Sequence, residues 1–216
     1  MAKWFFEPGH TAAEFSVRHM MVTFVRGHFK DIHGTFVFDP ADPGATSVEA
    51  TIESAGIWTG EAARDAHLKS EDFLDVEKHP KITFAGKQVE LAGADEAVLT
   101  GELTIRGIIR TVPLRVHYLG QWQTPWWEDG VEKGPKSRAG FAATTTINRH
   151  DFGVSWNSAL DRGGVVVGNT DHHRRRSDSP RRLMLHSFIG PESAWYHQLL
   201  HQPGGVMPMS KAVPPR

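Results

Sequence analysis

The stretch Thr59–Phe84, TGEAARDAHLKSEDFLDVEKHPKITF, combines helix and strand signals in a short space. Residues 60–69 are rich in alanine, glutamate and leucine, which favour a helix, and Thr59 is placed to cap its first turn. Pro80 disfavours helix at the residue before it, and the β-branched and aromatic residues that follow predict the start of a strand. The pattern therefore predicts a helical insert over residues 60–76 that leads into a strand.

The insert mixes charged side chains with apolar anchors. Arg64, Asp65 and His67 lie within four positions of one another, while Leu68 and Phe73 need to be buried. This density of charge beside apolar anchors is typical of a segment that covers an opening. We interpret Arg64 and Asp65 as a buried or half-buried ion pair that docks the insert, with a His67 ring nitrogen bonded to a backbone or carboxylate group. The alternative is a polar clamp on the head group of a ligand.

Outside the insert, apolar and polar residues alternate in short runs, which is the period of half-buried strands. The runs that predict strands or strand pairs are 13–19, 27–38, 48–52, 82–91, 98–105, 111–122, 138–147 and 165–167. Residues 125–136 predict a polar, hairpin-like loop. Seven or eight short strands favour an antiparallel barrel or a sandwich, and the barrel has the advantage that closure removes exposed edges. The alternation by itself leaves both architectures open.

The composition is that of an ordinary globular protein. The 216 residues are 39% hydrophobic and 23% charged, which suits one domain with a real core. A formal net charge of −1 gives no reason to expect nucleic acid or an anionic membrane surface as a partner. Cysteine is absent, so disulfides and thiolate metal sites are excluded. The N-terminal residues do not resemble a secretory signal, and no run approaches the roughly 20 apolar residues of a membrane span, so we expect a soluble, cytoplasmic protein.

The C-terminal part of the chain has a different composition. Residues 170–216 hold seven Lys and Arg against three Asp and Glu, together with six of the 13 prolines. Residues 1–169 instead carry 17 Lys and Arg against 22 Asp and Glu. Because such a shift marks a boundary, we divide the chain into one domain over 1–170 and a divergent, disordered tail over 171–216.

The spacing in the insert and in several flanking motifs resembles the YceI-like polyisoprenoid-binding family, a lipocalin-like group. The matching motifs are TG-x3-RD-x-HL-x-S-x-DF-x-D-x4-P-x-ITF from Thr59, FSVRH at 15–19, Gly27 with Phe29, Gly34 with FDP at 38–40, GELTIRG at 101–107, Gly140–Phe141 and RHDFG at 149–153. The resemblance covers roughly residues 4–169. It implies an all-β, antiparallel, lipocalin-like barrel with a short helical insert across one opening. It also implies a long-chain lipid partner, such as a polyisoprenoid or an isoprenoid quinone, inside the barrel.

The residues expected to point inward are mainly aromatic or branched aliphatic. The candidate ligand-binding residues are Phe15, Val17, His19, Phe29, Phe36, Phe38, Ile52, Phe73, Phe84, Leu103 and Phe141. Barrels of about eight strands hold either packed side chains or one ligand, so the residues alone leave a filled core and an apolar tunnel open. The resemblance favours the tunnel, because the barrels of the family hold lipid chains.

No catalytic or metal-binding motif stands out. None of the histidines in the first half of the matched region forms a helical His-x3-His pair, so we expect neither a metal nor a cofactor; they are His10, His19, His28, His33, His67 and His79. The sequence lacks a G-x-S-x-G motif, a P-loop and a dinucleotide-binding motif. Our interpretation is non-catalytic binding, storage or transport of an isoprenoid-like lipid. The alternative is an enzyme that acts on such a lipid through Asp65 and His67.

Three tryptophans, Trp122, Trp126 and Trp127, lie in or beside the polar loop of residues 125–136. We favour local packing of the loop as their role, with a rim that touches a membrane transiently as the alternative. A homodimer also remains open.

The point at which the resemblance stops suggests an origin for the tail. After Asn169 the family would continue with an alternating closing strand, but this chain reads Asp-His-His-Arg-Arg-Arg at 171–176. One set of codons for these residues, read one base later, encodes Thr-Ile-Thr-Val-Asp, which does alternate. We hypothesise a frameshift at this point, with a genuine basic extension as the alternative. Because residues 171–216 begin with like charges and no apolar face, we expect them to leave the sheet incomplete, with a gap between a first strand near Phe15 and the strand near 141–147 or Val165.

Overall fold

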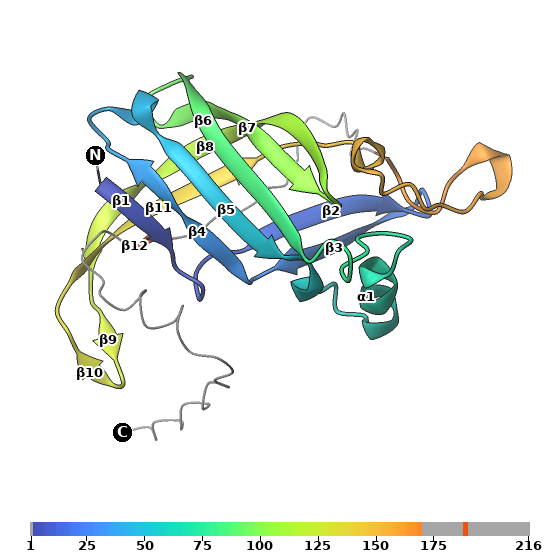
Figure 1. The fold of residues 1–216 in the computed structure, drawn as a ribbon, viewed down its shortest axis with the longest axis horizontal. Coiled ribbons are helices and arrows are strands. Elements are labelled where there is room, and N and C mark those ends of the chain that lie inside the picture. Colours follow the sequence, from blue (N-terminus) through green and yellow to red (C-terminus); the bar gives the residue numbers. More distant parts are fainter. Residues whose placement is uncertain (1, 170–187, 190–216) are drawn as a thin grey trace.

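Eight strands form a closed antiparallel barrel, and an α-helical insert lies at one end of it (Figure 1). The computed structural model describes residues 2–169 and 188–189. The strands follow one another around the barrel in the order β1 (Ala2–Phe6), β12 (Phe188–Ile189), β11 (Lys136–Thr144), β8 (Ile108–Thr124), β7 (Glu96–Ile105), β6 (Lys81–Leu91), β5 (Ser47–Glu53) and β4 (Ile32–Phe38). β4 pairs back with β1 and closes the ring. The all-β, lipocalin-like barrel predicted from the sequence is confirmed.

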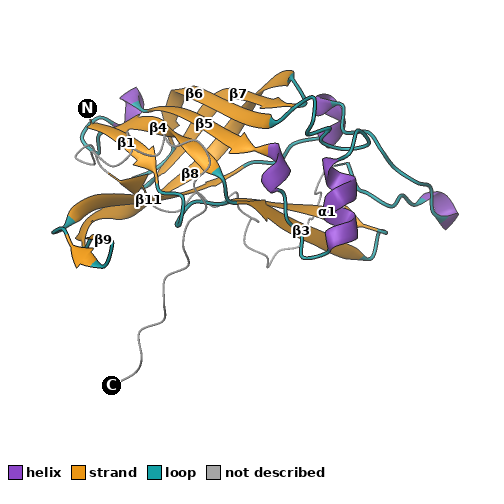
Figure 2. Ribbon diagram, turned by 60° about the horizontal axis from the view of Figure 1, so that its bottom comes forward, coloured by secondary structure: helices purple, strands orange, loops and turns teal. Residues whose placement is uncertain are grey.

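A separate two-stranded sheet lies outside this ring. β2 (Ala13–His19) and β3 (Thr23–Phe29) pair along their whole length. Figures 1 and 2 place this β2–β3 hairpin beside the insert, and backbone hydrogen bonds of 2.9 and 3.0 Å between His28 and Trp58 join the two. The expectation that the first barrel strand lies near Phe15 is therefore wrong, because β1 takes that place.

β1 is a strand that the alternation in the sequence did not predict. Trp4 and Phe6 face inward and are buried, whereas Lys3 is exposed. The Trp4 indole nitrogen donates a hydrogen bond to the Phe38 carbonyl at 3.2 Å, and the Trp4 ring stacks on Phe36 with centroids 5.9 Å apart. Five residues are too few to display a clear period of two, so pairing with β4 is what defines the strand.

The insert consists of η2 (Ser54–Gly56), α1 (Ala62–Lys69) and a series of turns that leads into β6. Glu61 caps α1, because its carboxylate accepts hydrogen bonds of 3.2 and 2.7 Å from amides in the first turn. The prediction that Thr59 caps the helix is wrong, since Thr59 lies outside the helix and hydrogen-bonds to Asp65 instead.

The barrel closes through two residues of the C-terminal region. β12 pairs with Phe5–Phe6 of β1 on one side and with Arg138–Ala139 of β11 on the other. The expectation that residues 171–216 leave the sheet incomplete is therefore wrong at Phe188–Ile189. Phenylalanine and isoleucine suit a strand, and the facing edges of β1 and β11 need partners. The rest of that tail, with the disorder and the frameshift expected there, lies outside the described residues.

An ion pair reinforces this closure. Arg138 donates two hydrogen bonds of 2.9 and 2.8 Å to the buried carboxylate of Glu7. These hydrogen bonds raise the pKa of Arg138 above its ordinary value. Because Glu7 directly follows β1 and Arg138 lies in β11, the pair links the two strands between which β12 runs.

Most of the other strands agree with the predicted alternation. The polar loop of 125–136 contains the short hairpin of β9 (Trp127–Glu128) and β10 (Val131–Glu132). The run 165–167 differs from the prediction, because it makes isolated bridges to His19 and Ala159 rather than a continuous strand.

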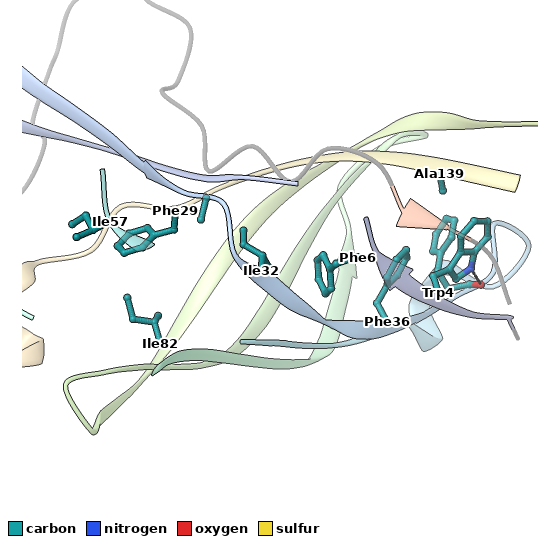
Figure 3. Close-up of a cluster of buried hydrophobic side chains, with 10 residues drawn as sticks. Trp4, Phe6, Phe29, Ile32, Phe36, Ile57, Ile82 and Ala139 are labelled. Atoms are coloured by element: carbon teal, nitrogen blue, oxygen red, sulfur yellow. Dashed lines mark hydrogen bonds between the residues drawn. The ribbon is translucent and has the colours of Figure 1, made fainter. Parts of the chain in front are cut away.

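The buried core extends along the inside of the barrel towards the insert. Figure 3 shows its side chains in a row, from Trp4 and Ala139 at one end to Ile57 and Ile82 at the other. Ile32, between them, has no exposed surface. Because Ile57 follows η2, this core joins the insert to the barrel.

Candidate functional site

A cavity of about 1960 Å³ occupies the interior beside the packed core. Barrel strands, the β2–β3 hairpin and the insert all contribute to its lining. Pockets for small-molecule ligands measure roughly 300–1,000 Å³, so this cavity has room for a much longer molecule. All eleven side chains that the sequence predicted as ligand-binding line it, namely Phe15, Val17, His19, Phe29, Phe36, Phe38, Ile52, Phe73, Phe84, Leu103 and Phe141.

Four rings, which we call the aromatic cluster, pack together on the cavity wall: Phe36, Phe38, Tyr118 and Phe141. Phe141 meets Phe38 and Phe36 edge to face, with centroids 5.0 and 5.5 Å apart. Tyr118 lies 5.2 Å from Phe141 and 5.3 Å from Phe38. Distances of this size are favourable for aromatic pairs, so the cluster forms a firm apolar wall.

Glycines on neighbouring strands keep two further rings in the cavity wall. A Cβ atom at Gly27 would lie 2.5 Å from the Phe15 ring, and one at Gly101 would lie 2.6 Å from the Phe84 ring. Any other residue at these two glycines would push the ring away. The glycine motifs of the sequence therefore position cavity-lining side chains.

At the insert, His67 packs against two more aromatic residues that line the cavity. Its ring lies edge to face against Phe73 and Trp156, with centroids 5.0 and 4.8 Å away. The His67 Nε2 atom is 2.9 Å from the Asp72 carboxylate. The predicted bond from a His67 ring nitrogen to a carboxylate is thus confirmed, with Asp72 as the partner.

The predicted Arg64–Asp65 ion pair is wrong, because each side chain hydrogen-bonds to Thr59 instead. Arg64 donates from Nε to the Thr59 hydroxyl at 2.8 Å and from Nη2 to the Thr59 carbonyl at 3.1 Å. Asp65 accepts from the Thr59 amide at 2.9 Å and from the Thr59 hydroxyl at 2.5 Å. Arg64 lines the cavity, whereas the buried Asp65 does not. The threonine is therefore the centre of this polar group.

The geometry does not bring Asp65 and His67 together as a catalytic pair. Residues two positions apart on a helix point to nearly opposite sides. In agreement, Asp65 turns towards Thr59 and His67 towards Asp72. Within residues 2–169 and 188–189, no group of three or more His, Asp or Glu side chains is arranged to hold a metal ion. No helix in this described part is long and apolar enough to cross a membrane.

Two arginines that the sequence reasoning missed fasten the loops around the insert. Arg149 donates to the carbonyls of Val154 and Trp156 at 2.6 and 2.9 Å and to that of Gly168 at 3.0 Å. Burial lowers the pKa of Arg149 below its ordinary value. Arg106 donates to the Phe73 carbonyl at 2.7 Å and so ties the insert to the β7–β8 turn. Both arginines belong to motifs that carry the family resemblance. These motifs were the signal in the sequence that could have identified them.

Tyr118 is a cavity-lining polar residue that was also missed as a site residue. The alternation in β8 puts it on the same side of the strand as Val112, Leu114 and Val116, which is the signal that could have found it. Desolvation by burial, with a smaller effect from the Asp95 carboxylate, raises the pKa of Tyr118. The hydroxyl therefore stays protonated at neutral pH.

The three tryptophans of the polar loop have different surroundings. Trp126 packs under the ammonium group of Lys136, 3.9 Å from the ring centroid, as local packing predicts. Trp122 and Trp127 are 74% and 57% exposed. Local packing therefore accounts for one of the three.

Comparison with known proteins places the chain in a recognised group. The YceI-like domain pattern matches residues 4–170. A UPF0312 protein of Pseudomonas putida strain W619 is 37% identical over 148 residues, which are 68% of this chain and 73% of the relative. A UPF0312 protein of Pseudomonas syringae pv. tomato is 36% identical over the same shares.

Solved structures share the fold. The Campylobacter jejuni YCEI protein is 31% identical, with a TM-score of 0.53 over 64% of this chain and 77% of its own. Burkholderia cenocepacia BcnA is 21% identical, with a TM-score of 0.60 over 86% of this chain and 98% of its own. A polyisoprenoid binding domain from Saccharophagus degradans is 11% identical, with a TM-score of 0.52 over 88% of this chain and 97% of its own. At their low identities, the last two show a common fold alone.

Proposed function

Because this chain belongs to the YceI-like domain family, we propose that its barrel binds a long apolar lipid of the polyisoprenoid type and stores or carries it without chemical change. The observation that carries the proposal is the cavity of about 1960 Å³, whose wall is largely aromatic and aliphatic. The name of the Saccharophagus degradans neighbour, a polyisoprenoid binding domain, supports the choice of ligand.

The energetics of such a ligand are favourable. Each buried CH2-sized group contributes about 0.8 kcal/mol, so a chain of roughly 15 carbons gains on the order of 12 kcal/mol before the costs of ordering it. A branched prenyl chain also offers methyl groups to the rings that line the cavity. Binding by burial needs no charged contact, which agrees with the largely apolar lining.

A role without catalysis is supported by the state of the polar groups at the insert. Thr59 engages Arg64 and Asp65, and Asp72 engages His67. A general base needs a free acceptor directed at its substrate, and Asp65 lies outside the cavity lining. We therefore assign Arg64, Asp65 and His67 a structural role in docking the insert.

Organic extraction of the purified protein, followed by mass spectrometry, tests the proposed function. We expect an unmodified long-chain lipid in stoichiometric amount. Ala50 lines the cavity, so Ala50→Trp should fill part of it and lower the lipid content. Ala85→Trp, on the exposed face of β6 next to β5, is the matched control and should retain the lipid. Absence of lipid from the wild type, together with no uptake of added lipid, would refute the proposal.

We further propose that the lipid is exchanged where the β2–β3 hairpin meets a bilayer. Met20 and Val22 at its turn are 50% and 86% exposed, although both are apolar. Arg18 and Arg26 on the same hairpin are also exposed. Apolar side chains with cations nearby suit a membrane surface that contains anionic lipids. Arg26 also lines the cavity, so this hairpin connects the proposed contact to the ligand.

A further inference from the structure

The aromatic cluster contains one phenol, Tyr118, and this residue lines the cavity. The Tyr118 ring lies against Phe38 and Phe141, inside the cavity wall. Among the described residues, the Tyr118 oxygen is not one of the fully buried side-chain atoms that lack a partner, so part of its surface is accessible. No hydrogen bond joins the Tyr118 hydroxyl to another described residue. An unused donor therefore belongs to a residue of the largely apolar cavity wall.

This donor differs from three other polar side chains around the cavity, which already have partners. Arg64 and His67 are held by Thr59 and Asp72, and Arg149 is held by backbone carbonyls. A ligand that used one of these groups would have to replace an existing hydrogen bond. The Tyr118 hydroxyl needs no such exchange, and a hydroxyl left without a partner in apolar surroundings is costly.

We propose that the Tyr118 hydroxyl donates a hydrogen bond to an oxygen atom of the bound lipid. The cavity would then select a prenyl chain that carries a hydroxyl or carbonyl oxygen over a plain hydrocarbon of the same skeleton. This inference rests on the proposed function, and it adds the ligand chemistry that the apolar wall alone does not specify.

The surroundings of Tyr118 indicate which end of the cavity holds that oxygen. The Tyr118 amide donates to the Asp95 carbonyl at 2.8 Å, in the turn between β6 and β7. Gly93 and Asp95 of this turn also line the cavity. The raised pKa of Tyr118 keeps its proton available for donation. The oxygen-bearing end of the lipid therefore lies near the β6–β7 turn.

A comparison of two ligands on two variants tests the inference. The probes are geranylgeraniol and the hydrocarbon of the same skeleton without its hydroxyl, titrated into delipidated protein. Tyr118→Phe keeps the ring and should weaken binding of the alcohol roughly two- to tenfold, while binding of the hydrocarbon stays the same. Thr83→Val removes the hydroxyl of another cavity-lining residue and should leave the ratio of the two affinities unchanged.

Spectroscopy provides a readout that depends on the hydrogen bond itself. The chain has 2 tyrosines, so labelling of the tyrosine Cζ atoms gives two signals, and Tyr118→Phe assigns one of them. The Tyr118 signal should shift differently with the alcohol than with the hydrocarbon. An unchanged affinity ratio in Tyr118→Phe, with both probes bound, would overturn the inference alone. Failure of the wild type to bind either probe would overturn the proposed function as well.

Discussion

A single threonine hydroxyl joins the polar residues at the start of the helical insert. The Thr59 hydroxyl accepts a hydrogen bond from Arg64 and donates one to the buried carboxylate of Asp65. The two charged residues thus interact through Thr59 and not with each other. Because each has a partner, neither imposes the cost of an unpaired buried group.

Removal of this hydroxyl should therefore destabilise the insert. We expect Thr59→Val to lower the free energy of unfolding by about 1–3 kcal/mol, because Asp65 loses a donor and Arg64 an acceptor. Thr59→Ser keeps the hydroxyl and should cost much less. Denaturant unfolding measures both, and a double-mutant cycle on Arg64 and Asp65 should show a coupling that disappears in the Thr59→Val background. A coupling that survives there would indicate a direct pair.

A substitution at Phe141 tests whether this side chain lines a cavity or fills a closed core. We expect Phe141→Ala to reduce lipid retention while the free energy of unfolding falls by less than the about 3–5 kcal/mol typical of aromatic deletions in closed cores. The physical reason is that one side of the ring already faces a cavity. Lipid content and denaturant unfolding are the measurements.

Trp4 supplies the matched control for this deletion. It is buried, with 3% of its surface exposed, and it does not line the cavity, so Trp4→Ala should show the full cost of a core deletion. Equal losses of stability in the two variants, without bound lipid in the wild type, would contradict a cavity at Phe141.

At the scale of elements, the β2–β3 hairpin lies outside the barrel and carries the proposed membrane contact. It pairs with no barrel strand, and its turn carries exposed Met20 and Val22. At the turn itself, the carbonyl of Val166 accepts a hydrogen bond of 2.7 Å from the Met20 amide. The turn is therefore held in position, although its apolar side chains are left without cover.

Charge placed at this turn should abolish the proposed bilayer contact. We expect Met20→Glu combined with Val22→Glu to prevent sedimentation with vesicles that contain anionic lipids, while lipid already bound in the cavity is retained. Ile109→Glu, at an apolar residue of the β7–β8 hairpin that is about as exposed as Met20, should have no effect. Wild-type protein that does not associate with such vesicles would refute this mode of exchange.

At the scale of the molecule, the closure of the barrel rests on a small number of contacts. β12 pairs over two residues on each side, whereas β7 and β8 pair over ten. Glu7 and Arg138 supply a further link across the same region. The β1–β12–β11 join is therefore the least extensively paired part of the ring.

Three lengths of chain test the importance of this join. A protein that ends at residue 169 lacks β12 and should melt at a lower temperature, with less bound lipid, than one that ends at residue 190. A version in which Thr-Ile-Thr-Val-Asp follows Thr170, as the frameshift hypothesis requires, should melt at a higher temperature than either. Equal melting temperatures and lipid contents in all three would show that closure by the C-terminal region is unimportant.

Much of the architecture was predictable from the residues. A period of two determines which side chains share a face, so the alternation located most strands and most of the eleven candidate residues, all of which line the cavity. The insert was also predictable, because helix formers, a proline and a strand start occur there in one short stretch. The cytoplasmic location and a homodimer stay predictions of the sequence.

The partners of individual groups depended on the tertiary structure. Local periodicity reports that a face is buried, but a hydrogen bond or a strand pair depends on where distant segments meet. Arg64 and Asp65 are adjacent in sequence, yet both bind Thr59. Phe5 and Ile189 are far apart in sequence, yet they pair where β1 meets β12. The all-β class, the insert and the inner face were thus determined by the sequence pattern, and the family resemblance added the choice of a barrel over a sandwich. The closing strand, the role of Thr59 and the free hydroxyl of Tyr118 were decided by the three-dimensional packing of that pattern.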